Sequence, residues 1–230
     1  ALFLDENGKP MGFMNAVVGG RSVGVPGIPK LLEDVHKRYG KLPWASLFDK
    51  PIALAEQGFT VSPRMAKSIE QNLEPLKRYP QTAAYFLPDG KPLAAGTVLK
   101  NPEFARSVRL LAKKGSAPFY QGMQAQNIVR AVTGAVDNPG KISMADLKNY
   151  RVIEREPVCA PYREYEVCGM GAPSSGAIAL GEILGVLQNQ DMKALGAENI
   201  HSWRWIGDAS RIAFTDRDYY VGDPAFVNVP

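Results

Sequence analysis

The sequence predicts a helix-rich α+β fold. Apolar residues recur every three to four positions over many short segments, which is the pattern of amphipathic helices. Two further regions show the turn residues and β-forming residues of paired strands. Strand–helix–strand alternation, which would indicate a parallel sheet, does not dominate the chain. We therefore expect one domain over residues 1–230, built mainly from short helices.

Residues 1–24 are predicted to be extended. Leu2–Asp5 and Met11–Val17 flank a polar turn at Asn7-Gly8, a pattern typical of a β-hairpin. The apolar run at the start is halted by acidic residues after four positions, so it predicts a strand and not a signal peptide. Position 1 is Ala and not Met, from which we expect the chain to be part of a longer protein.

A helical lobe is expected over residues 25–150. Proline at first helical positions, Ser or Asn before them and Gly after the last turn delimit its helices. Predicted N-caps include Ser62, Asn101 and Ser143, the last within a capping-box sequence. The helix that follows Ser62 is expected to kink or break near Pro75.

A strand pair is expected over residues 151–170, followed by core helices over residues 174–221. A glycine-rich loop separates the second strand from a long apolar helix. The expected elements are strands at Val152–Cys159 and Tyr165–Met170 about a turn at 160–164, and a final helix from about Glu198 to Tyr220.

The composition of the 230 residues is that of an ordinary globular protein. Hydrophobic residues make up 45% and charged residues 22%, so the chain can bury a sizeable core. The net charge of +4 is mild, and the basic residues are scattered, unlike the basic stripe of nucleic-acid-binding proteins. No apolar run approaches the ~20 residues of a membrane-spanning helix. We therefore expect no nucleic-acid partner and no membrane insertion.

The two cysteines, Cys159 and Cys168, flank the expected turn of the strand pair. A register in which paired residue numbers sum to 327 places them opposite each other, whereas a sum of 326 pairs Cys159 with Val167. The sequence leaves both registers open. A disulfide between the cysteines would fit an oxidising compartment. Two thiols are too few for a metal cluster built on thiolates.

The stretch Gly169–Gly176 lies between a predicted strand and a predicted helix, where phosphate-binding loops occur. It fails the dinucleotide-binding motif because Ser174 occupies the third glycine position. It also fails the P-loop motif, because no Lys follows Gly176. We therefore expect no nucleotide to bind there.

Two interpretations of Ser174 stay open. As a nucleophile in a sharp strand-to-helix turn, Ser174 would need an acid and a histidine later in the chain, and Asp191 and His201 stand in that order. As structural residues, Ser174 and Ser175 would cap the helix that begins at Gly176. The cap is favoured, because the chain lacks the strand–helix alternation of an α/β-hydrolase.

A metal centre is not expected. His36 and His201 are the two histidines of the chain, and neither has further ligands at a suitable spacing. The sequence therefore predicts no metal and no other cofactor.

Several sequence blocks resemble the gamma-glutamyltranspeptidase family, and they follow in the same order across essentially the whole chain. Ala172 and Ala177 depart from the family pattern P-P-S-S-G-G. The similar blocks are Gly24–Gly27, Tyr39–Trp44, Pro51–Val61, Phe119–Gly122, Ile142–Tyr150, Pro173–Gly176, Ala213–Arg217 and Gly222–Val227.

The resemblance implies a fold and an activity. Members of the family resemble N-terminal-nucleophile hydrolases, with stacked helix–sheet–sheet–helix layers. A precursor cuts itself before a Thr, which becomes the N-terminus of the small subunit and uses its own amine as general base. Such an enzyme transfers the gamma-glutamyl group of glutathione to water or an amino acid.

The functional residues of the family find no match among these 230 residues. The nucleophile belongs to a T-T-H-like motif, and no such motif is present. The glutamate-binding Arg belongs to a G-R-E-x-A-P-like block, which Gly20-Arg21-Ser22 does not match. The sequence therefore predicts an internal segment of the large-subunit region with no catalytic or substrate-binding residue of its own. A stand-alone interaction module without catalytic activity stays open as an alternative.

The resemblance also implies a partner and a location. The partner is the small subunit of the same precursor, and a small gamma-glutamyl compound is the substrate of the intact enzyme. The location is the periplasm or the exterior of the cell. Without its partner, the segment is expected to expose apolar surface and to self-associate.

Overall fold

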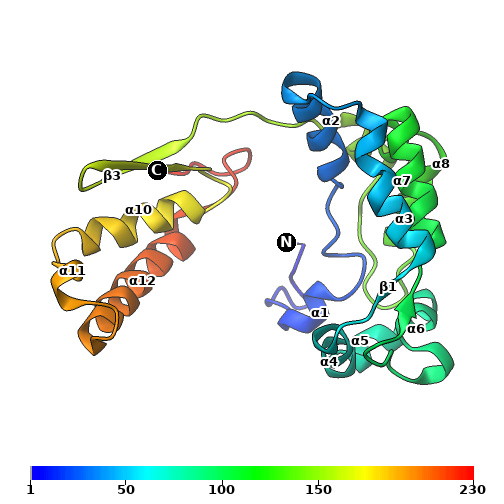
Figure 1. Cartoon of the computed structure of the whole chain (residues 1–230), viewed down its shortest axis with the longest axis horizontal. Coiled ribbons are helices and arrows are strands. Elements are labelled where there is room, and N and C mark those ends of the chain that lie inside the picture. The colour runs from blue at the N-terminus through cyan, green and yellow to red at the C-terminus, as the bar shows by residue number, and fades with distance from the viewer. Residues whose placement is uncertain (1) are drawn as a thin grey trace. The chain divides into compact units, whose positions relative to one another are not determined.

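A computed structural model describes residues 2–230 and divides the chain into two compact units (Figure 1). We call Ala1–Val152 the N-terminal unit and Ile153–Pro230 the C-terminal unit, and we describe each by itself. In the described residues, helices predominate and each unit holds one two-stranded antiparallel sheet. The predicted helix-rich α+β class is confirmed. The assignment of both units to a single domain stays a prediction.

Short helices make up most of the N-terminal unit. Its helices, with η for a 3-10 helix, are α1 (Phe13–Val17), α2 (Ile28–Tyr39), η1 (Trp44–Phe48), α3 (Asp49–Gln57), α4 (Pro63–Gln71), α5 (Leu73–Lys77), α6 (Pro80–Phe86), η2 (Pro88–Gly90), α7 (Pro102–Lys114), η3 (Ala117–Phe119), α8 (Gly122–Thr133) and α9 (Met144–Asn149). Strands β1 (Phe59–Thr60) and β2 (Val98–Leu99) pair with Phe59 opposite Leu99.

Side chains satisfy the free backbone N–H groups at several helix starts, as the sequence predicts. The Ser62 hydroxyl accepts a hydrogen bond from the backbone N–H of Met65 at 3.2 Å. The Asn101 carboxamide oxygen accepts one from the N–H of Phe104 at 2.9 Å. Ser143 closes the predicted capping box at the start of α9. Such caps typically contribute about 1 kcal/mol each to stability.

The break expected near Pro75 falls at Asn72 instead. Helix α4 ends at Gln71 and α5 begins at Leu73. Pro75 then stands in the first turn of α5, where backbone N–H groups have no intrahelical acceptor. The missing N–H of proline therefore removes no helical hydrogen bond.

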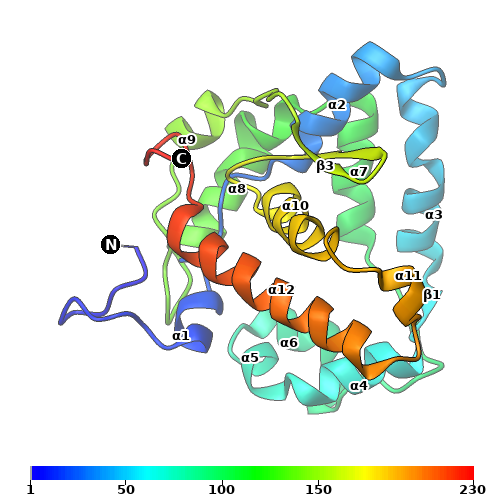
Figure 2. The same cartoon turned by 90° about the vertical axis from the view of Figure 1, so that its left-hand side faces the viewer.

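Three apolar clusters form the core of the N-terminal unit. They combine the apolar faces of its helices with residues from the connections between them. Helices α3 and α7 run side by side, and Ile52 of α3 packs against the third cluster (Figures 1 and 2). The clusters contain Val61, Ile69, Leu87, Leu93 and Leu99; Ala125, Val132, Ile142 and Leu147; and Phe48, Val108 and Leu111.

The prediction that Met11–Val17 forms the second strand of a hairpin is wrong. Residues 13–17 form α1, and a single bridge between Leu4 and Pro10 remains of the expected pairing. The cause is a long-range contact. The side-chain NH₂ of Asn138 donates to the carbonyls of Asn15 and Ala16, which a strand would need for its neighbour.

The C-terminal unit places a helix between a hairpin and a second helix. Strands β3 (Val158–Tyr162) and β4 (Tyr165–Gly169) lie on one side of α10 (Gly176–Leu187). Helix α12 (Ile200–Tyr220) runs antiparallel to α10 on the other side, after the short α11 (Met192–Leu195) (Figures 1 and 2). The hairpin packs closely on α10: a Cβ added at Gly181 would lie only 2.9 Å from the Cβ of Ala160.

The hairpin has the register in which paired residue numbers sum to 327. Cys159 is therefore opposite Cys168, and Tyr162 is opposite Tyr165. The first strand begins at Val158 and not at the predicted Val152. Val158 already pairs with Gly169, the last residue of β4, so earlier residues have no strand beside them.

No helix within residues 2–230 combines the length and the apolar character that crossing a bilayer requires.

Glu33 of α2 ties this helix to the junction between α7 and η3. Its carboxylate accepts hydrogen bonds from the backbone N–H of Ser116 at 3.0 Å and from the Ser116 hydroxyl, and it pairs with Lys37 at 2.7 Å. Burial would raise the pKa of Glu33, but the bonds from Lys37 and Ser116 outweigh it and hold this pKa at about 2. The ionised carboxylate of Glu33 therefore stabilises the folded state.

Glu33→Gln should destabilise the N-terminal unit by about 1–2 kcal/mol at neutral pH, a value reduced for solvent screening. The pKa of Glu33 is lower in the folded than in the unfolded chain. Its contribution is therefore complete above about pH 4.5 and is lost as the pH falls towards about 2. Urea unfolding followed by circular dichroism across this range measures the difference between variant and parent.

Glu70→Gln on α4 is the control, since Glu70 is exposed and no ion pair of its side chain is found in residues 2–230. It should change stability little at any pH. An equal loss for Glu33→Gln at pH 7 and pH 2.5 would contradict the electrostatic account and point to packing instead.

Candidate functional site

The loop that leads from β4 into α10 packs tightly against its own unit. The Ala172–Pro173 peptide bond is cis, and the backbone N–H of Ser174 donates to the carbonyl of Gly171 at 3.0 Å. A Cβ at Gly171 would lie 2.6 Å from Cγ2 of Val158, which is closer than real Cβ contacts. Glycine at this position therefore lets the loop lie against β3.

The predicted helix cap is only partly formed. Ser175 stands at the N-cap position of α10, but its hydroxyl makes no capping hydrogen bond. That hydroxyl instead accepts a hydrogen bond from Nε of Arg217 at 3.0 Å. The Ser174 hydroxyl accepts a long bond of 3.4 Å from the backbone N–H of Gly176. The capping role of Ser175 is thus wrong in this structure, because a residue from another helix competes for its oxygen.

Arg217 joins the end of α12 to the start of α10. Besides Ser175, its guanidinium group pairs with Asp218 and lies 5.7 Å from the ring centroid of Phe214. The carboxylate of Asp223, a few residues further on, accepts a hydrogen bond from the backbone N–H of Ala225 at 2.9 Å. Sequence reasoning missed the contact with Ser175, since the two residues are far apart in the chain and only helix packing brings them together.

A second polar residue belongs to the same pair of helices. Glu182 of α10 has a buried carboxylate oxygen without a hydrogen-bond partner in the described part of the chain. Burial raises the pKa of Glu182, and the nearby negative charge of Asp216 on α12 raises it further. These carboxylates oppose each other at neutral pH, so they do not stabilise the packing of α10 on α12.

The arrangement of α10 and α12 excludes a triad of Ser174, Asp191 and His201. The bond between Arg217 and Ser175 fixes the end of α12 at the start of α10. Because an α-helix rises about 1.5 Å per residue, His201 in the first turn of α12 lies roughly 24 Å from Arg217 along the helix axis. A nucleophile and its base must lie within about 3 Å.

Asp191 is also occupied. Its carboxylate caps α11 by accepting a hydrogen bond from the backbone N–H of Ala194 at 2.9 Å. The serine-hydrolase interpretation of Ser174 therefore has neither its base nor its acid in place.

The two cysteines are bonded to each other in the structure. They are directly opposite on β3 and β4, and their Sγ atoms are 2.08 Å apart. Glu166 lies on the same face of the hairpin, and its carboxylate is within 4.8 Å of both sulfurs. Disulfide sulfurs are not thiolates, so this group of three residues does not present metal ligands in the oxidised state.

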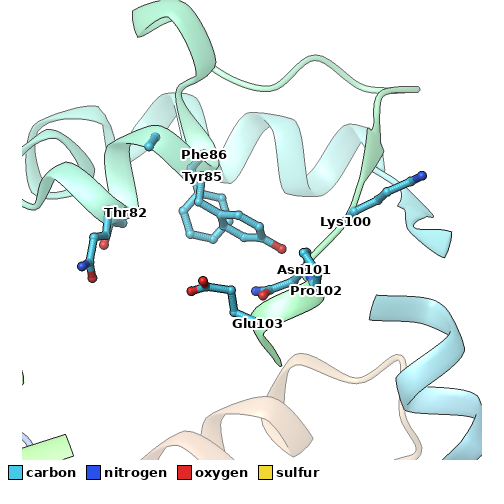
Figure 3. Close-up of a pocket in the computed structure, with 9 residues that line it drawn as sticks. Thr82, Tyr85, Phe86, Lys100, Asn101, Pro102 and Glu103 are labelled. Carbon is cyan, nitrogen blue, oxygen red and sulfur yellow. The ribbon is translucent and has the colours of Figure 1, made fainter. Parts of the chain in front are cut away.

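A hollow of about 440 Å³ opens between α6 and the start of α7 (Figure 3). The rings of Tyr85 and Phe86 form one side, and Asn101 and Glu103 lie on the other. Both polar residues already have structural partners, since Asn101 caps α7 and Glu103 pairs with Arg106 at 2.9 Å. The hollow therefore offers an apolar wall opposite two engaged polar residues, with Lys100 as the further charged residue of the lining.

The fold and the relatives of the chain define its class. The helix-rich architecture is similar to that of the gamma-glutamyltranspeptidase of Helicobacter pylori, with a TM-score of 0.90 and 32% identity over 99% of this chain and 64% of that one. Chains of this kind are N-terminal-nucleophile hydrolases.

A sequence profile described as gamma-glutamyltranspeptidase matches residues 1–230. The glutathione hydrolase proenzyme of Bacillus subtilis (strain 168) is 35% identical over all of this chain and 38% of its own length. The acylase ACY 1 proenzyme of Pseudomonas sp. (strain V22) is 39% identical over 93% of this chain and 38% of its own. The chain belongs to the gamma-glutamyltranspeptidase family. It spans about two fifths of the length of these relatives.

Reduction should add about 2 Da to the mass of the purified chain, since two thiols replace the disulfide. Mass spectrometry under non-reducing and reducing conditions measures this change. Cys168→Ser, which keeps the size of the side chain, is the control. The mass of the monomeric variant should be the same before and after reduction. Equal masses of the parent chain before and after reduction would show that the cysteines are free in solution.

Proposed function

We propose that this chain is a non-catalytic part of the large-subunit region of an enzyme that transfers gamma-glutamyl groups. The observation that carries the proposal is the 35% identity to a glutathione hydrolase proenzyme over the whole chain. The family's T-T-H-like motif and its arginine block have no match within these 230 residues. The nucleophile of the parent enzyme is thus a Thr outside them.

The proposed reaction is an acyl transfer. The Thr hydroxyl attacks the gamma-carbonyl carbon of the substrate, and the N-terminal amine accepts the hydroxyl proton. The amide C–N bond breaks, the protonated amine leaves, and an ester links the gamma-glutamyl group to Thr. Water or the amine of an amino acid then attacks this ester and regenerates the Thr. Neither a metal nor a cofactor takes part.

A second substrate class has its own support. The acylase ACY 1 proenzyme is 39% identical to this chain, slightly more than the glutathione hydrolase. Hydrolysis of an acyl side chain from a beta-lactam precursor would use the same nucleophile and the same ester intermediate. The two functions differ in the group that the acyl pocket accepts.

In the proposed enzyme, the small subunit of the same precursor is the partner of this chain, and the periplasm or the exterior of the cell is its location. The names of the bacterial relatives as proenzymes support a processed precursor. Large apolar side chains on α12 agree with a missing partner: Trp203, Phe214 and Tyr219 are 61%, 53% and 81% exposed.

The purified 230-residue chain should release no p-nitroaniline from gamma-glutamyl-p-nitroanilide above the buffer blank. The intact Bacillus subtilis relative serves as the positive control in the same assay. Expressed together with the residues that its gene encodes on either side, the chain should gain activity, and Thr→Ala in the T-T-H-like block should remove it.

The outcomes separate the alternatives. Turnover that follows the isolated chain through gel filtration would overturn the non-catalytic assignment, and Ser174→Ala would show whether Ser174 is responsible. If the longer protein cleaves only an acylated beta-lactam precursor, the acylase alternative is correct. If it cleaves neither substrate, the proposed function is wrong.

The isolated chain should self-associate as its concentration rises, because its apolar side chains are left in water. Multi-angle light scattering measures the average mass. Ile212→Gln, which replaces a half-exposed apolar side chain of α12, should lower the association, and Arg211→Gln beside it should not. A clean monomer at every concentration would contradict the expectation.

A further inference from the structure

A second hollow, of about 430 Å³, lies in the N-terminal unit and is polar. Its lining shares no residue with the hollow of Figure 3. Its lining comes from three separate stretches of the chain: the residues around α1, the end of α5 and the connection between α8 and α9. The lining residues are Met11, Asn15, Arg21, Arg78, Asp137 and Asn138.

The buried carboxamide of Asn138 organises this hollow. Asn138 is only 5% exposed, and its NH₂ group donates to the carbonyls of Asn15, Ala16 and Val18 at 2.8, 3.3 and 3.0 Å. These bonds fix the orientation of the carboxamide, so its oxygen points in a defined direction. That oxygen accepts a hydrogen bond from Nε of Arg21 at 2.7 Å.

Arg21 is held in place without an acidic partner. Besides the bond to Asn138, its Nη1 donates to the carbonyl of Leu2 at 2.9 Å. Both acceptors are neutral, so the positive charge of the guanidinium group is oriented but not balanced by them. A planar guanidinium fixed in this way is suited to an anion with two oxygens.

Arg78 brings a second guanidinium group to the same hollow. Its side chain makes no hydrogen bond or ion pair with any other described residue. Asp137, the acidic residue of the lining, forms no ion pair with either arginine in residues 2–230. The lining therefore has two positive charges and one negative charge. One anionic group would neutralise the remaining positive charge.

The hydroxyl of Tyr79 lies near Gly19 and Asn138. Its oxygen is buried and has no hydrogen-bond partner in the described residues. It lies beside Gly19, where an added Cβ would be 2.8 Å from this oxygen and 2.8 Å from Cβ of Asn138. This oxygen is thus close to the residue that orients Arg21, although Tyr79 does not line the hollow.

We propose that this hollow binds the oxyanion of a small molecule, a carboxylate or a phosphate group, between Arg21 and Arg78. Arg21 supplies a pre-oriented fork, and Arg78 supplies a charge that is free to close on the ligand. Because Asn138 holds Arg21 through neutral groups, the binding of the anion does not require an existing ion pair to break.

Isothermal titration of the full chain with inorganic phosphate and, separately, with sodium glutarate tests the site at constant ionic strength. At least one of the two anions should bind saturably with a Kd on the order of 1 mM. The preferred anion identifies the source of the oxyanion. Arg78→Gln should weaken that binding roughly tenfold, as expected for the loss of one charged hydrogen-bond donor.

Arg64→Gln is the matched control. It removes the same charge from an exposed arginine of α4 that does not line the hollow, and it should leave the affinity unchanged. Arg78→Lys keeps the charge and should retain part of the binding. Circular dichroism should show that all three variants fold, since both arginines are exposed.

Two results would overturn the proposal. One is the absence of saturable heat for both anions with the folded parent chain. The other is an equal loss of affinity in Arg78→Gln and Arg64→Gln, which would show attraction to the net charge of the protein and not to this site.

Discussion

Close approach of other atoms to a glycine backbone, where a Cβ would collide, is the constraint on which both units depend. In the N-terminal unit, a Cβ at Gly20 would lie 2.1 Å from the carbonyl oxygen of Val132, and one at Gly140 would lie 2.2 Å from that of Gly20. This contact brings the chain after α1 against the chain after α8, and so lets Asn138 reach its acceptors. In the C-terminal unit, the missing side chains of Gly171 and Gly181 instead make room for the side chains of Val158 and Ala160 of β3.

The parts of the fold that local chemistry determines could be predicted from the sequence. Caps at Ser62, Asn101 and Ser143 depend on residues within one helical turn, and they form as expected. The hairpin of the C-terminal unit could also be predicted, although its register was open between two choices one residue apart. The structure has the register that places the two cysteines opposite each other, and the residue pattern of the two strands does not distinguish it from the alternative.

Contacts between distant residues account for what sequence reasoning missed. The carbonyls of α1 are bonded by Asn138, more than one hundred residues later, so a segment with strand-like alternation becomes a helix. Ser175 has the right position for a cap, but Arg217 takes its hydroxyl. The proposed function rests on ordered sequence blocks and on similarity to known proteins, and not on a site in the structure.

The disulfide also changes what a cut in the chain would do. Cys159 and Cys168 close a small covalent ring around the exposed two-residue turn at Arg163-Glu164. A protease that cleaves after Arg163 would open the turn but leave both pieces of the chain attached through sulfur. Helices α10 and α12 would thus stay covalently attached to residues 1–163 after cleavage. The nick would become visible only once the sample is reduced.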